Sequence, residues 1–207
     1  MTVVTTPPYP SSAASTGVPI ELIWRLSVEQ YHAMIQAGIL TEDDPVELLE
    51  GWLVTKMPKN PRHSLVTQLA QAALARALPP GWHVRGQEPV TTEDSEPEPD
   101  IVVARGDLRQ YRDRHPHPQD IALIIEVADS SLQRDRMLKQ RLYAAAGIPA
   151  YWVVNLLELC IEAHAKPSGP GERPLYHQQR NYGPTEEIPV ILDGVESARI
   201  AVRDLLP

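Results

Sequence analysis

The sequence has little cysteine, little positive charge and no long apolar run. Its single cysteine, Cys160, excludes an internal disulfide and a cysteine-based zinc cluster, and it fits a protein of the reducing cytoplasm. No apolar stretch approaches the roughly 20 residues needed to span a bilayer, so we expect no membrane partner. The 19 basic and 27 acidic residues give a formal net charge of −8, which argues against a protein that coats nucleic acid without specificity.

The charges are nevertheless distributed unevenly along the chain. Residues 88–100 hold six acidic side chains and no basic one, whereas residues 134–141 hold four basic side chains and one acidic one. Such an asymmetry can place a divalent cation on one side of a site and a phosphate on the other. The alternative is that both runs are solvated faces, as charge runs usually are.

Length and composition indicate one globular domain after a polar tail. The stretch MTVVTTPPYPSSAASTG at the amino terminus has neither a basic start nor an apolar core, so it is not a secretory signal. Its composition predicts a disordered tail over residues 1–18. The chain of 207 residues is 43% apolar, which suits a single domain with an adequate core over residues 19–207.

Periodicity predicts an α/β fold with a mixed central sheet flanked by helices. Apolar strands 121–127 and 150–156 are joined by a helical pattern, so we expect them to be parallel neighbours inside the sheet. An amino-terminal hairpin is predicted within residues 46–57. The other expected elements are helices 27–38, 63–78 and 132–146, strands 83–90 and 101–104, a carboxyl-terminal hairpin from 157–166 and 175–180, and an edge strand at 198–202.

Two carboxylates stand at the ends of predicted strands. Asp100 follows the stiff, extended stretch SEPEP and precedes the strand IVVA, and Glu126 follows the apolar run ALII. Carboxylates at strand ends of one sheet can converge on a single Mg²⁺, which commonly takes one or two of them together with water and substrate phosphate. The alternative is that Asp100 caps a strand and Glu126 pairs with an arginine.

A lysine on the helix predicted at 132–146 adds a third charge. Lys139 lies at the edge of the apolar stripe formed by Leu138 and Leu142, so its stem can follow the core while its amine reaches the sheet edge. The alternative is a surface pair of Asp135 with Lys139 at i, i+4, worth about 0.3–0.5 kcal/mol.

At these residues the sequence resembles the Uma-type restriction endonuclease family of the PD-(D/E)XK nuclease superfamily. The resemblance is carried by SEPEPDIVVARG and by ALIIEVADSSLQRDRMLKQRLYAAAGIPAYWVVNL, and VELLEGWLVTKMP with PRHS also fits. It implies a restriction-endonuclease-like core in which Asp100 and Glu126 are the catalytic acids and bind Mg²⁺ or Mn²⁺. The carbonyl of Val127 is a further metal ligand by analogy. The superfamily's usual lysine is replaced by Ala128, and Lys139 matches the family's lysine on the following helix.

Three other residues fall in family-like segments and are candidates for the same site. They are Glu47, Glu50 and His63. Glu50 before Gly51 is more often a turn residue, and His63 is more often a helix cap or a core histidine than a base.

The resulting functional prediction is a metal-dependent endonuclease that hydrolyses phosphodiester bonds in DNA. A homodimer is expected because two antiparallel strands favour a two-fold symmetric enzyme. The alternative is a catalytically inactive protein with the nuclease fold that acts as a binding or scaffold module. The net charge of −8, the missing lysine at Ala128 and the lack of a target-recognition domain motivate this second hypothesis.

Overall fold

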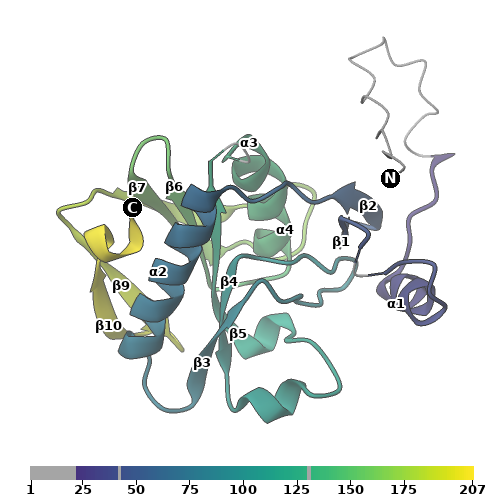
Figure 1. The fold of residues 1–207 in the computed structure, drawn as a ribbon, viewed down its shortest axis with the longest axis horizontal. Coiled ribbons are helices and arrows are strands. Elements are labelled where there is room, and N and C mark those ends of the chain that lie inside the picture. Colours follow the sequence, from purple (N-terminus) through teal and green to yellow (C-terminus); the bar gives the residue numbers. More distant parts are fainter. Residues whose placement is uncertain (1–21, 42, 130–131) are drawn as a thin grey trace, which may run out of the picture.

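The centre of the computed structural model is a six-stranded sheet with the order β3-β4-β5-β6-β7-β8 (Figure 1). The structure describes residues 22–41, 43–129 and 132–207, so the tail predicted over residues 1–18 lies outside the described residues. The strands of this sheet are β3 (Trp82–Gly86), β4 (Ile101–Arg105), β5 (Ile121–Ala128), β6 (Ala150–Asn155), β7 (Cys160–Pro167) and β8 (Tyr176–Tyr182).

The sheet is mixed, as the sequence predicts. Strands β5 and β6 are parallel, with Leu123 opposite Ala150 and Ala128 opposite Asn155. All the other neighbouring pairs in this sheet are antiparallel. The predicted carboxyl-terminal hairpin is β7–β8, and it extends the central sheet to the β8 edge.

Helices cover the sheet on opposite faces, and β5 contributes side chains to both. Helix α2 (Pro61–Ala77) packs on the face to which Ile125 points, while α4 (Gln140–Ala145) packs on the face to which Ile124 points. Successive strand residues alternate between faces. Glu126 therefore lies on the α4 side, within an apolar layer that offers a carboxylate little solvation.

The third predicted helix is continuous in space but changes its winding. It consists of α3 (Leu132–Arg134), a π-helical turn over Asp135–Lys139 and then α4. A π turn inserts a residue into the helix and rotates the turns after it, and such turns are frequent at functional sites. Here the turn leaves both Asp135 and Lys139 buried, at 2% and 4% exposure.

Two further hairpins lie outside the central sheet. The segment predicted as an edge strand at 198–202 belongs to β10 (Val195–Ala201), which pairs with β9 (Glu187–Leu192) in a separate two-stranded sheet. The predicted strand therefore forms, but it does not lie at the edge of the central sheet, and β9 was missed. Ile188 and Ile200 of this hairpin pack into the core on the α2 side, so the pair covers the sheet face instead of lengthening the sheet (Figure 1).

The amino-terminal hairpin forms as predicted, from β1 (Val46–Leu49) and β2 (Trp52–Thr55). Leu48 is fully buried and packs against Val28 and Tyr31 of α1 (Val28–Gln36). Leu48 also accepts a backbone hydrogen bond at 2.7 Å from the amide of Glu96, which ties the hairpin to the acidic segment before β4.

Helix α1 begins at the capping box that its sequence indicates. The Ser27 hydroxyl accepts from the Gln30 amide at 3.2 Å, and the Gln30 side chain accepts from the Ser27 amide at 3.0 Å. Helix α2 starts two residues earlier than predicted, at Pro61, because Asn60 caps it by accepting from the His63 amide at 2.9 Å. In the part of the chain that the structure describes, no helix is both long and apolar enough to cross a membrane.

The hairpin pair Leu48 and Leu53 provides a test of how β1 is anchored. The two residues are cross-strand partners, but Leu48 is buried and Leu53 is 38% exposed. We expect Leu48→Ala to lower the free energy of unfolding by about 2–5 kcal/mol, the usual cost of a leucine cavity in a core. Leu53→Ala, the matched control, should cost much less in the same urea titration. Equal losses for the two variants would show that the hairpin is not held through Leu48.

Candidate active site

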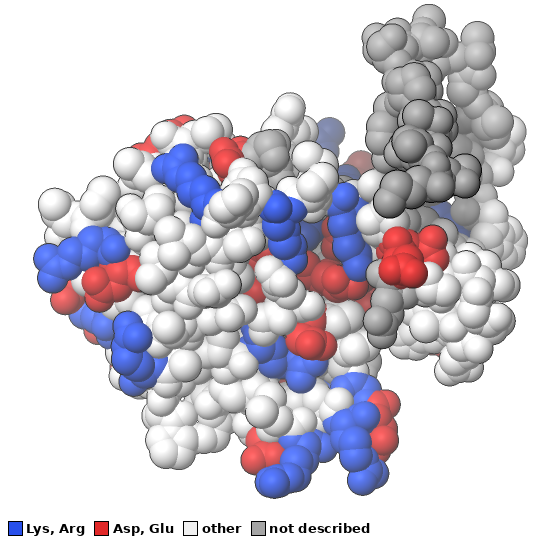
Figure 2. Space-filling view, in the orientation of Figure 1, with Lys and Arg blue, Asp and Glu red and all other residues white. Residues whose placement is uncertain are grey.

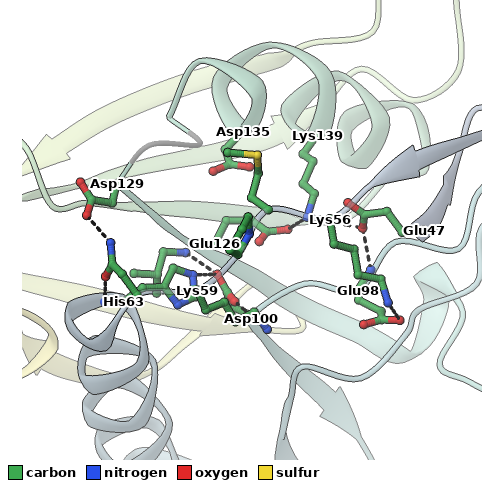
Figure 3. A pocket seen from close by; sticks show the side chains of 14 residues that line it. Glu47, Lys56, Lys59, His63, Glu98, Asp100, Glu126, Asp129, Asp135 and Lys139 are labelled. Carbon is green, nitrogen blue, oxygen red and sulfur yellow. Dashed lines mark hydrogen bonds and ion pairs between the residues drawn. The ribbon is translucent and has the colours of Figure 1, made fainter. Parts of the chain in front are cut away.

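A polar pocket forms where β4 begins and β5 ends, beside the start of α2 and the π-helical turn (Figure 3). The hairpin strand β1 and the connection from β2 to α2 close its other sides. Most of its described lining carries a charge. The lining residues are Glu47, Lys56, Met57, Pro58, Lys59, Asn60, His63, Glu98, Asp100, Glu126, Val127, Asp129, Asp135 and Lys139.

Asp100 reaches the pocket from the residue before β4 and is 5% exposed. Its Oδ2 atom accepts from the Val127 amide at 2.9 Å and is 3.0 Å from Nε2 of His63. Burial pushes the pKa of Asp100 upward, but the His63 hydrogen bond and charge and the Val127 amide outweigh it, so the pKa lies below its ordinary value. Both bonds use Oδ2, and neither occupies Oδ1.

Glu126 enters the pocket from the far end of β5 and is 4% exposed. Its Oε1 atom accepts from the Lys139 ammonium at 2.8 Å and from the Tyr143 hydroxyl at 2.9 Å, so its partner is a lysine and not an arginine. Burial raises the pKa of Glu126 to about 8; the Lys139 charge opposes this rise and the Asp100 charge adds to it. The two acids of one pocket therefore have pKa values shifted in opposite directions, a pattern that separates catalytic roles in enzymes.

Lys139 comes from the last position of the π-helical turn, opposite the start of α2 (Figure 3). Its ammonium lies 2.8 Å from Glu126 and 3.7 Å from Oε2 of Glu47. These carboxylates outweigh burial and raise the pKa of Lys139, which keeps the amine charged. The surface location considered for Asp135 and Lys139 from the sequence is wrong, because both side chains are buried.

The structure brings Glu47 and His63 into this pocket and leaves Glu50 outside it. Glu47 is 2% exposed and also accepts from the Glu98 amide at 3.0 Å, so it bridges Lys139 and the acidic segment before β4. Glu50 occupies a turn with φ +49° and pairs with Arg141 at 2.6 Å. Glu50 is not among the described residues that line the pocket.

Tyr143 is a pocket partner that the sequence reasoning missed. It is fully buried, and its hydroxyl shares Oε1 of Glu126 with Lys139. Residues four apart on a helix lie on one face, so the spacing from Lys139 to Tyr143 was a usable signal. Lys56, Lys59, Glu98 and Asp129 were also missed, since only the folded chain shows that their loops close the pocket.

The donor set suits a hard divalent cation such as Mg²⁺. Asp100 and Glu126 offer carboxylate oxygens, and the carbonyl of Val127 faces the same side as its amide, which bonds to Asp100. Among the described residues no three His, Cys, Asp or Glu side chains form a metal-binding group. A cation here would rest on the two carboxylates and the Val127 carbonyl, with water or substrate phosphate completing its shell, as Mg²⁺ commonly does.

The fold is shared with a solved nuclease-type structure. The chain resembles a protein from Anabaena variabilis ATCC 29413 titled "a putative nuclease belonging to DUF820", with a TM-score of 0.65 and 15% sequence identity. The match covers 87% of this chain and 97% of that one. This likeness shows the fold that the two proteins share, in this chain a mixed α/β domain with a six-stranded central sheet and helices.

The family follows from the sequence match. The model of the Uma2 family, described as "Putative restriction endonuclease", matches residues 28–202. The chain belongs to this family, and the match includes every residue of the pocket described above. No curated protein matches the chain.

The raised pKa of Glu126 predicts that the metal-free protein loses stability as the pH rises. Its folded pKa of about 8 lies above the ordinary value of 4.5. The contribution of Glu126 is therefore complete below about pH 4.5 and is lost as the pH climbs through about 8. In a chelating buffer, we expect the melting temperature of the wild type to fall relative to that of Glu126→Gln across this range.

The control for this comparison is Glu172→Gln, which changes an exposed carboxylate outside the pocket. Its melting curve against pH should follow that of the wild type. If the curves of the wild type and Glu126→Gln also run parallel from pH 4.5 to 8, the carboxylate does not hold its proton as inferred.

Proposed function

We propose that the protein is a metal-dependent DNA endonuclease that hydrolyses phosphodiester bonds. The single observation that carries this proposal is the meeting of Asp100, Glu126 and Lys139 in one pocket. Family membership and the fold support nuclease chemistry in general. The metal is inferred from the carboxylate oxygens of the pocket. The DNA substrate is inferred because hydrolysis of a phosphodiester requires an activated water molecule and positive charge near the phosphate.

Each of the three side chains has a task that its environment supports. Asp100 would bind the cation as a carboxylate, because its pKa lies below the ordinary value. Its Oδ2 atom bonds to Val127 and His63, so Oδ1 is the oxygen that would face the cation. Glu126 is its second ligand, and a cation would offset the burial that raises its pKa. A bound Mg²⁺ or Mn²⁺ supplies Lewis acidity toward the phosphate and lowers the pKa of a water molecule.

Lys139 is placed to orient the attacking water and to stabilise negative charge that develops on the phosphate. An ammonium has three N–H donors; the contact of Lys139 with Glu126 at 2.8 Å is a hydrogen bond, whereas that with Glu47 at 3.7 Å is a longer ion pair. Ala128 lies two residues after Glu126 on the same face of β5. The helix that carries Lys139 packs on this face, so the amine approaches the sheet from the side to which a lysine at position 128 would point.

Cleavage assays on plasmid DNA with Mg²⁺ or Mn²⁺ test this proposal. We expect Asp100→Asn and Glu126→Gln each to lower the cleavage rate by at least about a hundredfold, comparable to the loss of one transition-state stabiliser. Asp113→Asn is the control, because Asp113 is 76% exposed and lies outside the pocket. The wild type should lose activity in EDTA and regain it when Mg²⁺ is added.

The assay also separates the endonuclease from a binding or scaffold protein with the same fold. Wild-type protein that binds DNA but cuts no nucleic acid with either metal would favour the second function. Cleavage that survives in both Asp100→Asn and Glu126→Gln would place the active site elsewhere.

A homodimer is the assembly that double-strand cleavage favours, and it remains a prediction. The segments after Leu157 are where we expect the contact, since β8 is an edge of the central sheet. An edge strand presents unpaired backbone groups that a second chain can meet. Sedimentation velocity at micromolar concentration should give the mass of two chains. A monomer under these conditions would contradict the assembly.

A further inference from the structure

Lysine is used selectively in this chain. The sequence has four lysines, Lys56, Lys59, Lys139 and Lys166, and its other 15 basic residues are arginines. Three of the four lysines line the pocket, and no described arginine side chain does. Lysine is a compact charge on a flexible stem, suited to a mobile phosphate, whereas arginine favours fixed, bidentate pairs. The basic groups of the pocket are therefore lysine ammonium groups, which can leave a carboxylate and bind a phosphate instead.

Of the three pocket lysines, Lys59 is held least tightly. Lys139 is buried between two carboxylates, and Lys56 forms a close ion pair with Glu98. The Lys59 ammonium lies 3.8 Å from Oδ1 of Asp100, beyond hydrogen-bond distance, and its side chain is 39% exposed. Its only described ion-pair partner is thus the carboxylate oxygen that the proposed cation would also use.

The backbone around Lys59 keeps the side chain at the entrance of the pocket. Lys59 lies in the connection between β2 and α2, between Pro58 and the helix cap Asn60. The Asn60 side chain also donates to Asp129 at 2.8 Å, which ties this connection to the residue after β5. In Figure 3 Lys59 reaches Asp100 from the α2 side, while Lys139 reaches Glu126 from the opposite side.

The pocket lining has more acidic than basic side chains, so a positively charged side chain at its entrance would favour the approach of a phosphate. Six acidic residues and three lysines are among the described lining residues. Figure 2 shows acidic side chains recessed in the middle of this face, with basic side chains beside them. An approaching phosphodiester is repelled by uncompensated carboxylates, and an exposed ammonium at the rim lowers that barrier. Lys139 and Lys56 form closer contacts with carboxylates than Lys59 does, so Lys59 is the pocket lysine best placed to bind a phosphate.

We propose that Lys59 is a substrate-binding residue whose ammonium binds a backbone phosphate of the DNA at the entrance of the pocket. The proposal rests on the nuclease function proposed above and names a residue that positions its substrate. When Asp100 binds a divalent cation, Lys59 loses the anion that it faces, and the phosphate supplies another. A purely structural ion pair of Lys59 with Asp100 is the competing explanation.

The experiment measures DNA binding separately from cleavage. Binding of a fluorescein-labelled DNA duplex is followed by anisotropy, with Ca²⁺ in place of Mg²⁺, over a series of salt concentrations. We expect Lys59→Gln to weaken binding about tenfold and to lower the slope of log Kd against log salt by about 1, the effect of one lost phosphate contact. Lys59→Arg should keep most of the affinity. Lys166→Gln, which removes the one exposed lysine outside the pocket, should match the wild type.

Two further measurements distinguish phosphate binding from a structural role. Lys59→Gln should bind Ca²⁺ no more weakly than the wild type in calorimetry, because a positive charge beside Asp100 has been removed. Its cleavage of DNA with Mg²⁺ should show a larger change in KM than in kcat. Loss of Ca²⁺ affinity, with DNA binding restored at saturating Ca²⁺, would overturn the proposal in favour of a structural ion pair.

The outcomes also separate the role of Lys59 from the function on which it rests. If the wild type cleaves DNA but Lys59→Gln keeps the wild-type Kd and salt slope, the assignment of Lys59 fails while the nuclease function stands. If the wild type neither binds nor cleaves DNA, both fail. A wild type that cleaves, together with a selective loss of affinity and salt slope in Lys59→Gln, supports both.

Discussion

The arrangement of this protein depends on the buried hydrogen bond between Glu126 and Lys139. Both side chains are nearly inaccessible, and a buried carboxylate or ammonium without a partner is strongly unfavourable. Lys139 donates a hydrogen bond to Glu126 at 2.8 Å, so each buried group has a partner, and Tyr143 donates a second hydrogen bond to the same oxygen. It also joins the sheet to the helix that covers it, so the end of β5 and the π-helical turn are fixed relative to each other.

The remaining pocket is organised around this pair. Glu47 reaches Lys139 from the amino-terminal hairpin, which is anchored through Leu48. Asp100 is bonded to the amide of Val127, the residue after Glu126, so the two acids are linked through a short stretch of backbone. The pocket thus places the carboxyl oxygens of Asp100 and Glu126 next to the charged Lys139. That combination can hold a cation and still present a positive group to a phosphate.

Much of the fold was predictable because its signals are local. The capping box at Ser27, the apolar strands β5 and β6 and the hairpin turn at Glu50 depend on neighbours in sequence, and the structure confirms them. The pairing of β10 was not predictable in this way. Its weak alternation fits an edge strand equally well, and only packing of the β9–β10 hairpin on the α2 side decides its place.

The sequence by itself determined which acids stand at strand ends, because prolines before Asp100 and the apolar run before Glu126 place them there. Tertiary structure alone decided what these acids face. Helical periodicity left Lys139 at the edge of an apolar stripe, and the π-helical turn moved it and Asp135 inward. The lysines of the β2–α2 connection acquired a common pocket for the same reason: loops carry no periodic signal, and their position is set by the elements that they join.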